Sequence, residues 1–273
     1  MKLRAPWLTA FGIAASVFFA QAAAQNPSIT PQETNAPAQT TQPAALTSVS
    51  APTHTGAYWN KHDQGLLVDF GDLAHFKDAD AALAPAAADE DRVVFMGDSI
   101  TAGWKLAESF PGKPYVNRGI SGETSPQMLV RFRQDVIDLH PKVVVILAGT
   151  NDIAGNTGPM TPEQSEDNLA SMADLATANG IRVVLCSVLP SFDFPWSPGQ
   201  QPAPKIAALN DWIKAYATQK RYPYVDYYAA MKDDRGGLPA TLSRDGVHPL
   251  PAGYTIMTPL AEAGIEKALK GSE

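Results

Sequence analysis

The chain has 273 residues, of which 45% are hydrophobic and 18% charged, and this is enough for one sizeable hydrophobic core. Its formal net charge of -7, without a run of Lys and Arg, argues against nucleic acid as a partner. A single cysteine, Cys186, excludes an intramolecular disulfide and a cysteine-rich zinc site.

The first 24 residues have the pattern of a secretory signal peptide. Lys2 and Arg4 precede an apolar run over residues 7–20, and alanines at 22–24 supply the small side chains of a cleavage site. The run is too short for a stable membrane span. We therefore expect cleavage near residue 24 and an exported protein, periplasmic or secreted, with no membrane span after cleavage. The alternative is an uncleaved membrane anchor.

Two further segments precede the first predicted strand. Residues 25–53 consist mainly of Gln, Pro, Thr, Ala, Ser and Asn, a composition that buries too little apolar surface to fold, and they are predicted to be a disordered linker. Aromatic and aliphatic residues then arrive together. We expect a single domain over residues 54–273, in which residues 54–91 form a short ordered lead-in.

Short apolar runs alternate with stretches of helical spacing after residue 91. The predicted strands cover residues 92–96, 115–117, 143–148, 183–188 and 224–226. The predicted helices cover residues 125–139, 163–179, 205–220 and 252–270. The third and fourth strands are apolar nearly throughout, as expected for parallel strands covered on both faces. This alternation predicts a three-layer, doubly wound α/β domain with a parallel five-stranded sheet.

Ligands of such a sheet bind outside the carboxyl ends of its strands, so the loops that follow the strands are the places to search. Four of these loops carry polar residues, at 97–101, 119–124, 149–152 and 245–249. All four are expected at one rim of the sheet.

Ser99 follows the first predicted strand at the start of a helix, where unpaired backbone N–H groups can stabilise an oxyanion. The alternative for Ser99 is an ordinary helix N-cap. A serine nucleophile needs a neutral imidazole that a third group orients. Asp245 and His248 lie three residues apart in one predicted turn, which Pro249 stiffens, and the other four histidines lack such a setting. The alternative for His248 is a surface turn.

The two middle loops offer hydrogen-bond donors. Gly122 lets the chain approach a substrate and present its backbone N–H, and Asn151 carries a side-chain amide. Taken alone, Gly122 is typical of a turn and Asn151 of a turn or a helix cap. Together with Ser99, Asp245 and His248, however, they give one nucleophile, two oxyanion donors and a base with its partner at one rim, a combination that caps and turns alone rarely produce.

The four loops resemble the sequence blocks of the SGNH, or GDSL-type, hydrolase family. Gly97-Asp98-Ser99 resembles the nucleophile block, and the glycine, asparagine and final blocks are matched, in family order, by residues 117–124, 149–152 and 245–249. Glu123 departs from the common pattern, which often has Asp there. The resemblance implies a flavodoxin-like α/β fold and hydrolysis of carboxylic esters without a metal or other cofactor.

The same resemblance assigns roles to single residues. Ser99 corresponds to the nucleophile, His248 to the general base and then acid, and Asp245 to the residue that orients His248. The N–H groups of Ser99 and Gly122 and the amide of Asn151 correspond to the oxyanion hole.

The substrate prediction depends on the loop after the fourth strand. Phe192, Phe194 and Trp196 in this loop are expected to stack on a sugar ring or line an acyl groove, or alternatively to cover the sheet edge. We expect short acyl esters, such as acetyl esters, of carbohydrates or small molecules as substrates. The alternatives are a lysophospholipase or thioesterase for longer acyl chains, and a non-catalytic carbohydrate- or lipid-binding module. A metal-dependent hydrolase is disfavoured because the chain has no His-x-x-x-His pair. Oligomeric state carries no prediction.

Overall fold

The computed structural model describes residues 56–271. The expected signal peptide (1–24) and linker (25–53) lie outside the described residues. Within the described range, no helix has both the length and the apolar character needed to cross a bilayer.

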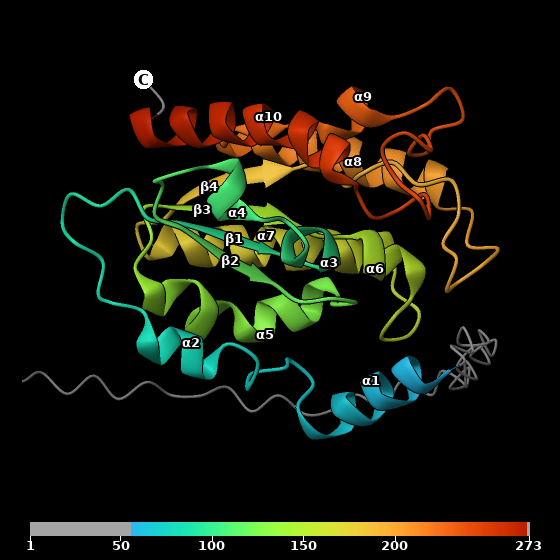
Figure 1. Ribbon diagram of the computed structural model, residues 1–273, viewed down its shortest axis with the longest axis horizontal. Helices are drawn as coiled ribbons and strands as arrows, with labels where there is room; N and C mark the ends of the chain where they lie inside the picture. The colour runs from blue at the N-terminus through green and yellow to red at the C-terminus, as the bar shows by residue number, and fades with distance from the viewer. Residues whose placement is uncertain (1–55, 272–273) are drawn as a thin grey trace, which may run out of the picture. The chain divides into compact units, whose positions relative to one another are not determined.

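A parallel five-stranded sheet forms the centre of the domain, in the order β2-β1-β3-β4-β5 (Figure 1). In chain order the strands are β1 (Val93–Gly97), β2 (Tyr115–Gly119), β3 (Val143–Leu147), β4 (Arg182–Cys186) and β5 (Tyr224–Val225). Every residue of β1 and β3 is buried, because these strands are central and helices cover both of their faces. The three-layer α/β fold expected from the sequence is thus confirmed.

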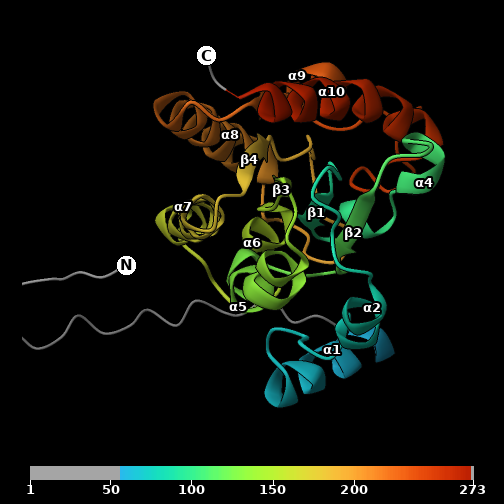
Figure 2. The same ribbon diagram turned by 90° about the vertical axis from the view of Figure 1, so that its left-hand side faces the viewer.

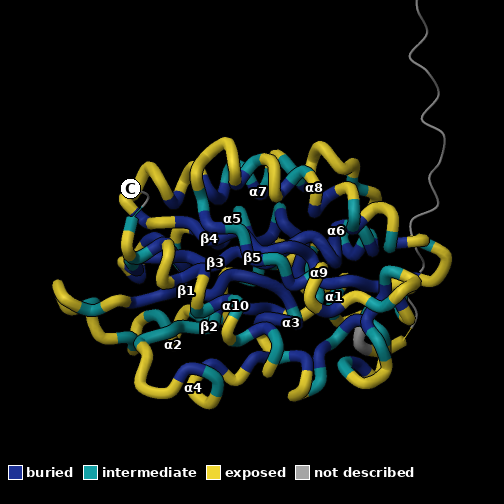
Figure 3. The backbone as a smooth tube through the Cα atoms, turned by 90° about the horizontal axis from the view of Figure 1, so that it is seen from above, coloured by how far each residue is buried: buried dark blue, intermediate teal, exposed yellow. Residues whose placement is uncertain are grey.

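Helices pack on both faces of this sheet (Figure 2). One face is covered by α5 (Ser125–Asp135), α7 (Pro162–Ala178) and α8 (Pro202–Lys220). The other is covered by α4 (Leu106–Ser109), α9 (Tyr227–Met231) and α10 (Pro251–Lys270). Figure 3 shows the buried strands between helices whose outer surfaces are exposed. Two short helices, α3 (Ser99–Ala102) and α6 (Thr150–Ala154), begin directly after strands and shape the site.

Local sequence sets the ends of the helices. Thr124 and Thr161 form capping boxes with the glutamines three residues later, so α5 and α7 each begin one residue after a threonine. The predicted helix 125–139 is interrupted: α5 ends at Asp135, and the 3-10 turn η1 (Ile137–Leu139) follows. The helix predicted to start at 205 instead begins at Pro202, since proline is well suited to a first helical turn.

The lead-in contains two helices, α1 (Ala57–Val68) and α2 (Lys77–Ala82), which lie beside α5 (Figures 1 and 2). The side-chain amide of Gln127 on α5 donates to the carbonyl of Phe70 at 2.7 Å. The end of α1 is poorly covered, because the side chains of Leu67 and Val68 are almost fully exposed.

An ion pair fastens α2 to β2, which is an edge strand of the sheet. Nε of Arg118, on β2, donates to Oδ1 of Asp80 at 2.9 Å. The ring of Phe76 lies 4.6 Å from the Arg118 guanidinium and so covers its other face. The lead-in is therefore attached to the sheet by a specific, largely buried contact.

Candidate active site

Ser99 is held where β1 turns into α3. Asp98 caps this helix, because its Oδ1 accepts a hydrogen bond from the N–H of Ile100 at 2.9 Å. Gly119 allows α3 to lie against the end of β2, since a Cβ at this position would come within 2.2 Å of the backbone nitrogen of Ala102. Ser99 is partly exposed, whereas Asp98 and Ile100 beside it are buried.

The structure brings Ser99, His248 and Asp245 into one hydrogen-bonded chain. Ser99 Oγ lies 2.9 Å from Nε2 of His248, although 149 positions separate the two residues. Nδ1 of His248 lies 2.6 Å from Oδ2 of Asp245. The other carboxylate oxygen accepts hydrogen bonds from the N–H of Val247 at 3.0 Å, the N–H of His248 at 2.9 Å and the hydroxyl of Ser243 at 3.0 Å.

These hydrogen bonds determine the charge of Asp245. Partial burial on its own raises the pKa of the carboxyl, but the His248 ring and the N–H groups of Val247 and His248 outweigh this effect and hold the pKa well below its ordinary value. An ionised Asp245 keeps the proton of His248 on Nδ1, which leaves the lone pair of Nε2 facing the Ser99 hydroxyl. The arrangement can therefore activate a serine nucleophile.

The three expected oxyanion donors also gather at this rim. Gly122 has a φ of +82°, a left-handed conformation that favours glycine. Among the described residues, the N–H groups of Ser99 and Gly122 have no hydrogen-bond partner. Nδ2 of Asn151 donates to the carbonyl of Glu123 at 2.9 Å and makes only a long contact, 3.4 Å, with Oδ2 of Asp98. One hydrogen of the Asn151 amide is therefore weakly engaged.

A buried ion cluster joins α5 to the loop over residues 119–124, the glycine loop. The guanidinium of Arg131, on α5, is fully buried and forms ion pairs with Glu123 and with Asp135. It also donates to the carbonyl of Arg118 at 2.8 Å. The Glu123 carboxylate thus fixes the loop whose carbonyl holds the Asn151 amide, which gives a structural role to the departure from the family pattern at position 123.

Several residues of the site were not singled out from the sequence. Asp152 is buried, and its Oδ1 accepts a hydrogen bond from the N–H of Ser125 at 2.7 Å. This bond joins the segment 149–152 to the start of α5. Asn156 is also buried and contacts both Gly122 and Asn151. The sequence signal for Asn156 is weak, since it lies in a glycine-rich turn that follows the asparagine block.

The three aromatic residues of the loop after β4 lie in different environments. Phe192 is 56% exposed, and its ring lies 5.5 Å from the guanidinium of Arg235. Trp196 is partly buried, with its ring centroid 6.0 Å from that of His248. Phe194 is fully buried and stacks on Trp196, so the expectation that it contacts substrate is wrong: its ring is core rather than binding surface.

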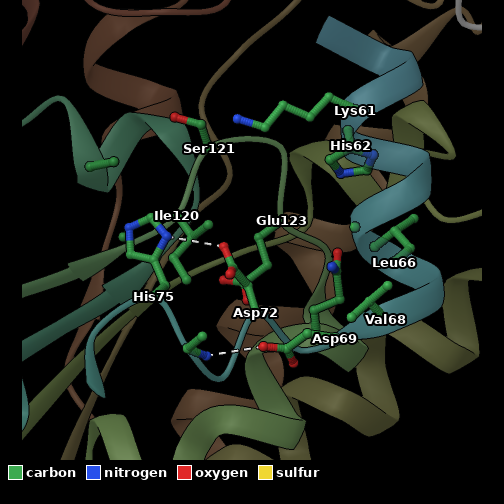
Figure 4. Close-up of a pocket in the computed structure, with 15 residues that line it drawn as sticks. Lys61, His62, Leu66, Val68, Asp69, Asp72, His75, Ile120, Ser121 and Glu123 are labelled. Carbon is green, nitrogen blue, oxygen red and sulfur yellow. Dashed lines mark hydrogen bonds and ion pairs between the residues drawn. The ribbon is translucent and has the colours of Figure 1, made fainter. Parts of the chain in front are cut away.

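A cavity of about 670 Å³ lies between the glycine loop and α1 (Figure 4). Its lining is mostly apolar, with Leu66 and Ile120 among the lining residues. Lys61 extends from α1 toward Ser121, the residue before Gly122, and Asp72 and His75 form a pair at 3.0 Å on the opposite side (Figure 4). Within the described part of the chain, no group of three or more His, Cys, Asp or Glu side chains is arranged to hold a metal ion.

Comparison with known proteins identifies the family of this chain. The sequence pattern of the GDSL-like lipase/acylhydrolase family matches residues 95–256. Esterase TesA of Pseudomonas aeruginosa is 33% identical over 172 residues, which cover 58% of this chain and 79% of TesA. An acylhydrolase of Bacteroides fragilis is 44% identical, with a TM-score of 0.71 over 74% of this chain and 99% of its own. A GDSL-like lipase of Bacteroides thetaiotaomicron is 47% identical, with a TM-score of 0.70 over 73% and 99%. The chain therefore belongs to the SGNH/GDSL hydrolase family and is a carboxylic ester hydrolase.

Proposed function

We propose that this hydrolase cleaves esters through an acyl-serine intermediate on Ser99. The observation that carries the proposal is the continuous chain from the Ser99 hydroxyl through His248 to Asp245, with contacts of 2.9 and 2.6 Å. Helix capping does not explain this contact, because the N-cap of α3 is Asp98 and not Ser99.

In the proposed reaction, Nε2 of His248 takes the Ser99 proton while Oγ attacks the ester carbonyl carbon. The carbonyl oxygen becomes an oxyanion, which the N–H groups of Ser99 and Gly122 and the weakly engaged hydrogen of Asn151 stabilise. The tetrahedral intermediate then collapses, and the departing alkoxide takes the proton from His248. A water molecule, deprotonated by His248, releases the acid by the reverse sequence and restores the Ser99 hydroxyl.

The variant Ser99→Ala tests this mechanism. It should fold normally and lose at least about 10⁴-fold in kcat on p-nitrophenyl acetate, because members of a triad act as a unit. A fluorophosphonate probe should label the wild type but not the variant. Ser171→Ala, on α7, serves as the matched control and should keep full turnover. Undiminished turnover in Ser99→Ala rules the mechanism out.

We further propose short acyl esters of carbohydrates as substrates. His248 delivers its proton to the leaving alcohol, and the aromatic side chains that reach solvent lie on this side of the site. Trp196 lies beside His248, and Phe192 and Asp245 line the same small cavity of about 200 Å³. The exposed ring of Phe192 and the Arg235 guanidinium next to it suit the apolar face and the hydroxyl groups of a sugar leaving group.

The apolar cavity beside Ser121 favours a second candidate, esters of longer acyl chains, because its volume accommodates a medium-length chain.

A series of p-nitrophenyl esters from acetyl to dodecanoyl, assayed beside acetylated xylan, separates the two candidates. Leu66→Trp, which narrows the cavity, should leave acetyl turnover unchanged if the substrate is short. Phe192→Ala should then raise KM for acetylated xylan but not for p-nitrophenyl acetate. A preference for long chains that Leu66→Trp abolishes supports the second candidate instead.

We also propose that the domain over residues 54–273 is exported after removal of residues 1–24, with 25–53 as a linker. The charge and apolar pattern of the first 24 residues supports this proposal. The N-terminal sequence of the protein recovered outside the cytoplasm of a bacterial host should begin near residue 25. Recovery in the membrane fraction with Lys2 retained contradicts it.

A further inference from the structure

The loop after β4 reaches the oxyanion donors through one buried asparagine. Nε1 of Trp196 donates to Oδ1 of Asn156 at 3.0 Å. Nδ2 of Asn156 donates to the carbonyl of Gly122 and to Oδ1 of Asn151, both at 2.9 Å. A single side chain thus links the indole to two of the three expected oxyanion donors.

The chemistry of these groups gives the chain of hydrogen bonds one direction. An indole N–H can only donate, so the Asn156 atom facing Trp196 must be the amide oxygen. The Asn156 amide nitrogen therefore donates to two acceptors, the carbonyl oxygen of Gly122 and the amide oxygen of Asn151. Because its amide oxygen faces Asn156, the amide nitrogen of Asn151 faces Glu123 and Asp98. The weakly engaged hydrogen of Asn151 lies on this nitrogen.

We propose that Asn156 and Trp196 are positioning residues for the oxyanion hole: they hold its donors in place through the hydrogen bonds of Asn156 and do not themselves donate to the oxyanion. The inference rests on the proposed function of Ser99, Gly122 and Asn151. Gly122 sits in a left-handed conformation with its carbonyl anchored by Asn156, and the Asn151 amide has its oxygen anchored by the same residue. Donors fixed before the reaction cost no reorganisation when the oxyanion forms.

The role of Trp196 in this arrangement is its N–H rather than its ring. Its ring stacks on the buried Phe194 with centroids 5.3 Å apart and an interplanar angle of 22°. Phenylalanine at this position keeps an aromatic ring and removes the donor together with part of the indole volume. Trp104→Phe provides a matched control, because it removes the same atoms and Nε1 of Trp104 donates to Ser109 Oγ at 3.0 Å, outside the oxyanion network.

The experiment compares kcat and KM on p-nitrophenyl acetate for Trp196→Phe, Asn156→Ala and the double variant. We expect kcat to fall about 100-fold in Asn156→Ala, the lower end of the range for the loss of one oxyanion donor, and about 10-fold in Trp196→Phe, which keeps Asn156, with KM changed by less than about twofold in both. The double variant should match Asn156→Ala, because Trp196 acts through Asn156. Trp104→Phe should keep the kcat of the wild type.

Labelling by a fluorophosphonate provides a second readout, since the phosphoryl oxygen uses the same donors. The labelling rate constant of Trp196→Phe should fall by the same factor as its kcat. This measurement tests the inference even if Asn156→Ala does not fold. The inference is overturned if Trp196→Phe changes KM alone, if the two substitutions have independent effects, or if only the unfolding midpoint moves. Ser99→Ala is assayed alongside: if it keeps turnover, the proposed function fails, whereas an inactive Ser99→Ala with unaffected Trp196→Phe rejects only this inference.

Discussion

On the oxyanion side of the active site, Asp98, Glu123 and Asn151 are at most 3% exposed and are held by a network of buried polar contacts. On the base side, the side chains of Asp245 and His248 remain 40% and 42% exposed in a surface turn. The base side relies on local hydrogen bonds, since one carboxylate oxygen of Asp245 holds the backbone of its own turn. Charge stabilisation here thus depends on tertiary structure, whereas the Asp245–His248 pair that orients the general base is assembled within a few residues.

The two sides also shift their carboxyl groups in opposite directions. Burial raises the pKa of Asp98 to about 6, although the N–H of Ile100 partly offsets the rise. Burial acts on Asp245 in the same direction, but the hydrogen bonds from His248 and Val247 win and lower its pKa. The same residue type is thus tuned toward the neutral form on one side and toward the ionised form on the other.

The largest effect is expected on the base side. Asp245→Asn should lower kcat by about 10⁴-fold, the scale seen when a triad aspartate becomes an amide, because Nδ1 of His248 no longer faces a carboxylate. Steady-state kinetics on p-nitrophenyl acetate measure this. The near-ultraviolet circular dichroism should match the wild type, and a loss below 10-fold contradicts the assigned role of Asp245.

The next effect concerns stability on the oxyanion side. Arg131→Met leaves the buried carboxylates of Glu123 and Asp135 without their partner, which should lower the free energy of unfolding by about 3–5 kcal/mol. Urea denaturation measures the change. The control is Arg133→Met on the same helix, whose exposed guanidinium lies 3.9 Å from Asp138 and should cost less than about 1 kcal/mol. Equal costs for the two variants contradict the comparison.

Removal of one oxyanion donor should have a slightly smaller effect. Asn151→Ala is expected to lower kcat by about 10²–10³-fold with KM little changed, because the amide acts on the charge of the transition state. A change confined to KM points instead to a ground-state contact. The ratio of the kcat loss in Asn156→Ala to that in Asn151→Ala shows how much of the Asn151 contribution depends on its hydrogen bond from Asn156.

The smallest effects are the pH slopes of stability, which should have opposite signs. The folded state raises the pKa of Asp98 above its ordinary 3.8, so the folded state holds more protons and the free energy of unfolding falls as pH rises from about 3.8 to about 6. The pKa of Asp245 is lowered, so its contribution is present above about 3.8 and is lost as pH falls below this value. Urea denaturation between pH 2.5 and 7 of wild type, Asp98→Asn and Asp245→Asn measures each slope by difference. If the stability curves of both variants run parallel to that of the wild type, the opposite pKa shifts assigned to Asp98 and Asp245 are contradicted.

The sequence predicts much of this architecture, because the relevant signals are local. Strands β1 and β3 follow directly from uninterrupted apolar runs, and the four site loops follow from short blocks in family order. Early termination of α5 and the burial of Phe194 are not predictable in this way, since both depend on packing between elements. The pairing of Trp196 with Asn156 joins positions 40 residues apart through side chains alone, and no spacing rule reveals it.

The clasp between Asp80 and Arg118 has a consequence for how this protein is handled. It joins the lead-in to β2 through an Arg118 guanidinium and an Asp80 carboxylate that are both largely buried. A recombinant fragment cut back to Arg92 keeps all four sequence blocks but removes Asp80 and Phe76, the partners of that guanidinium. A lower free energy of unfolding, rather than a defect in chemistry, is the behaviour to expect from such a fragment.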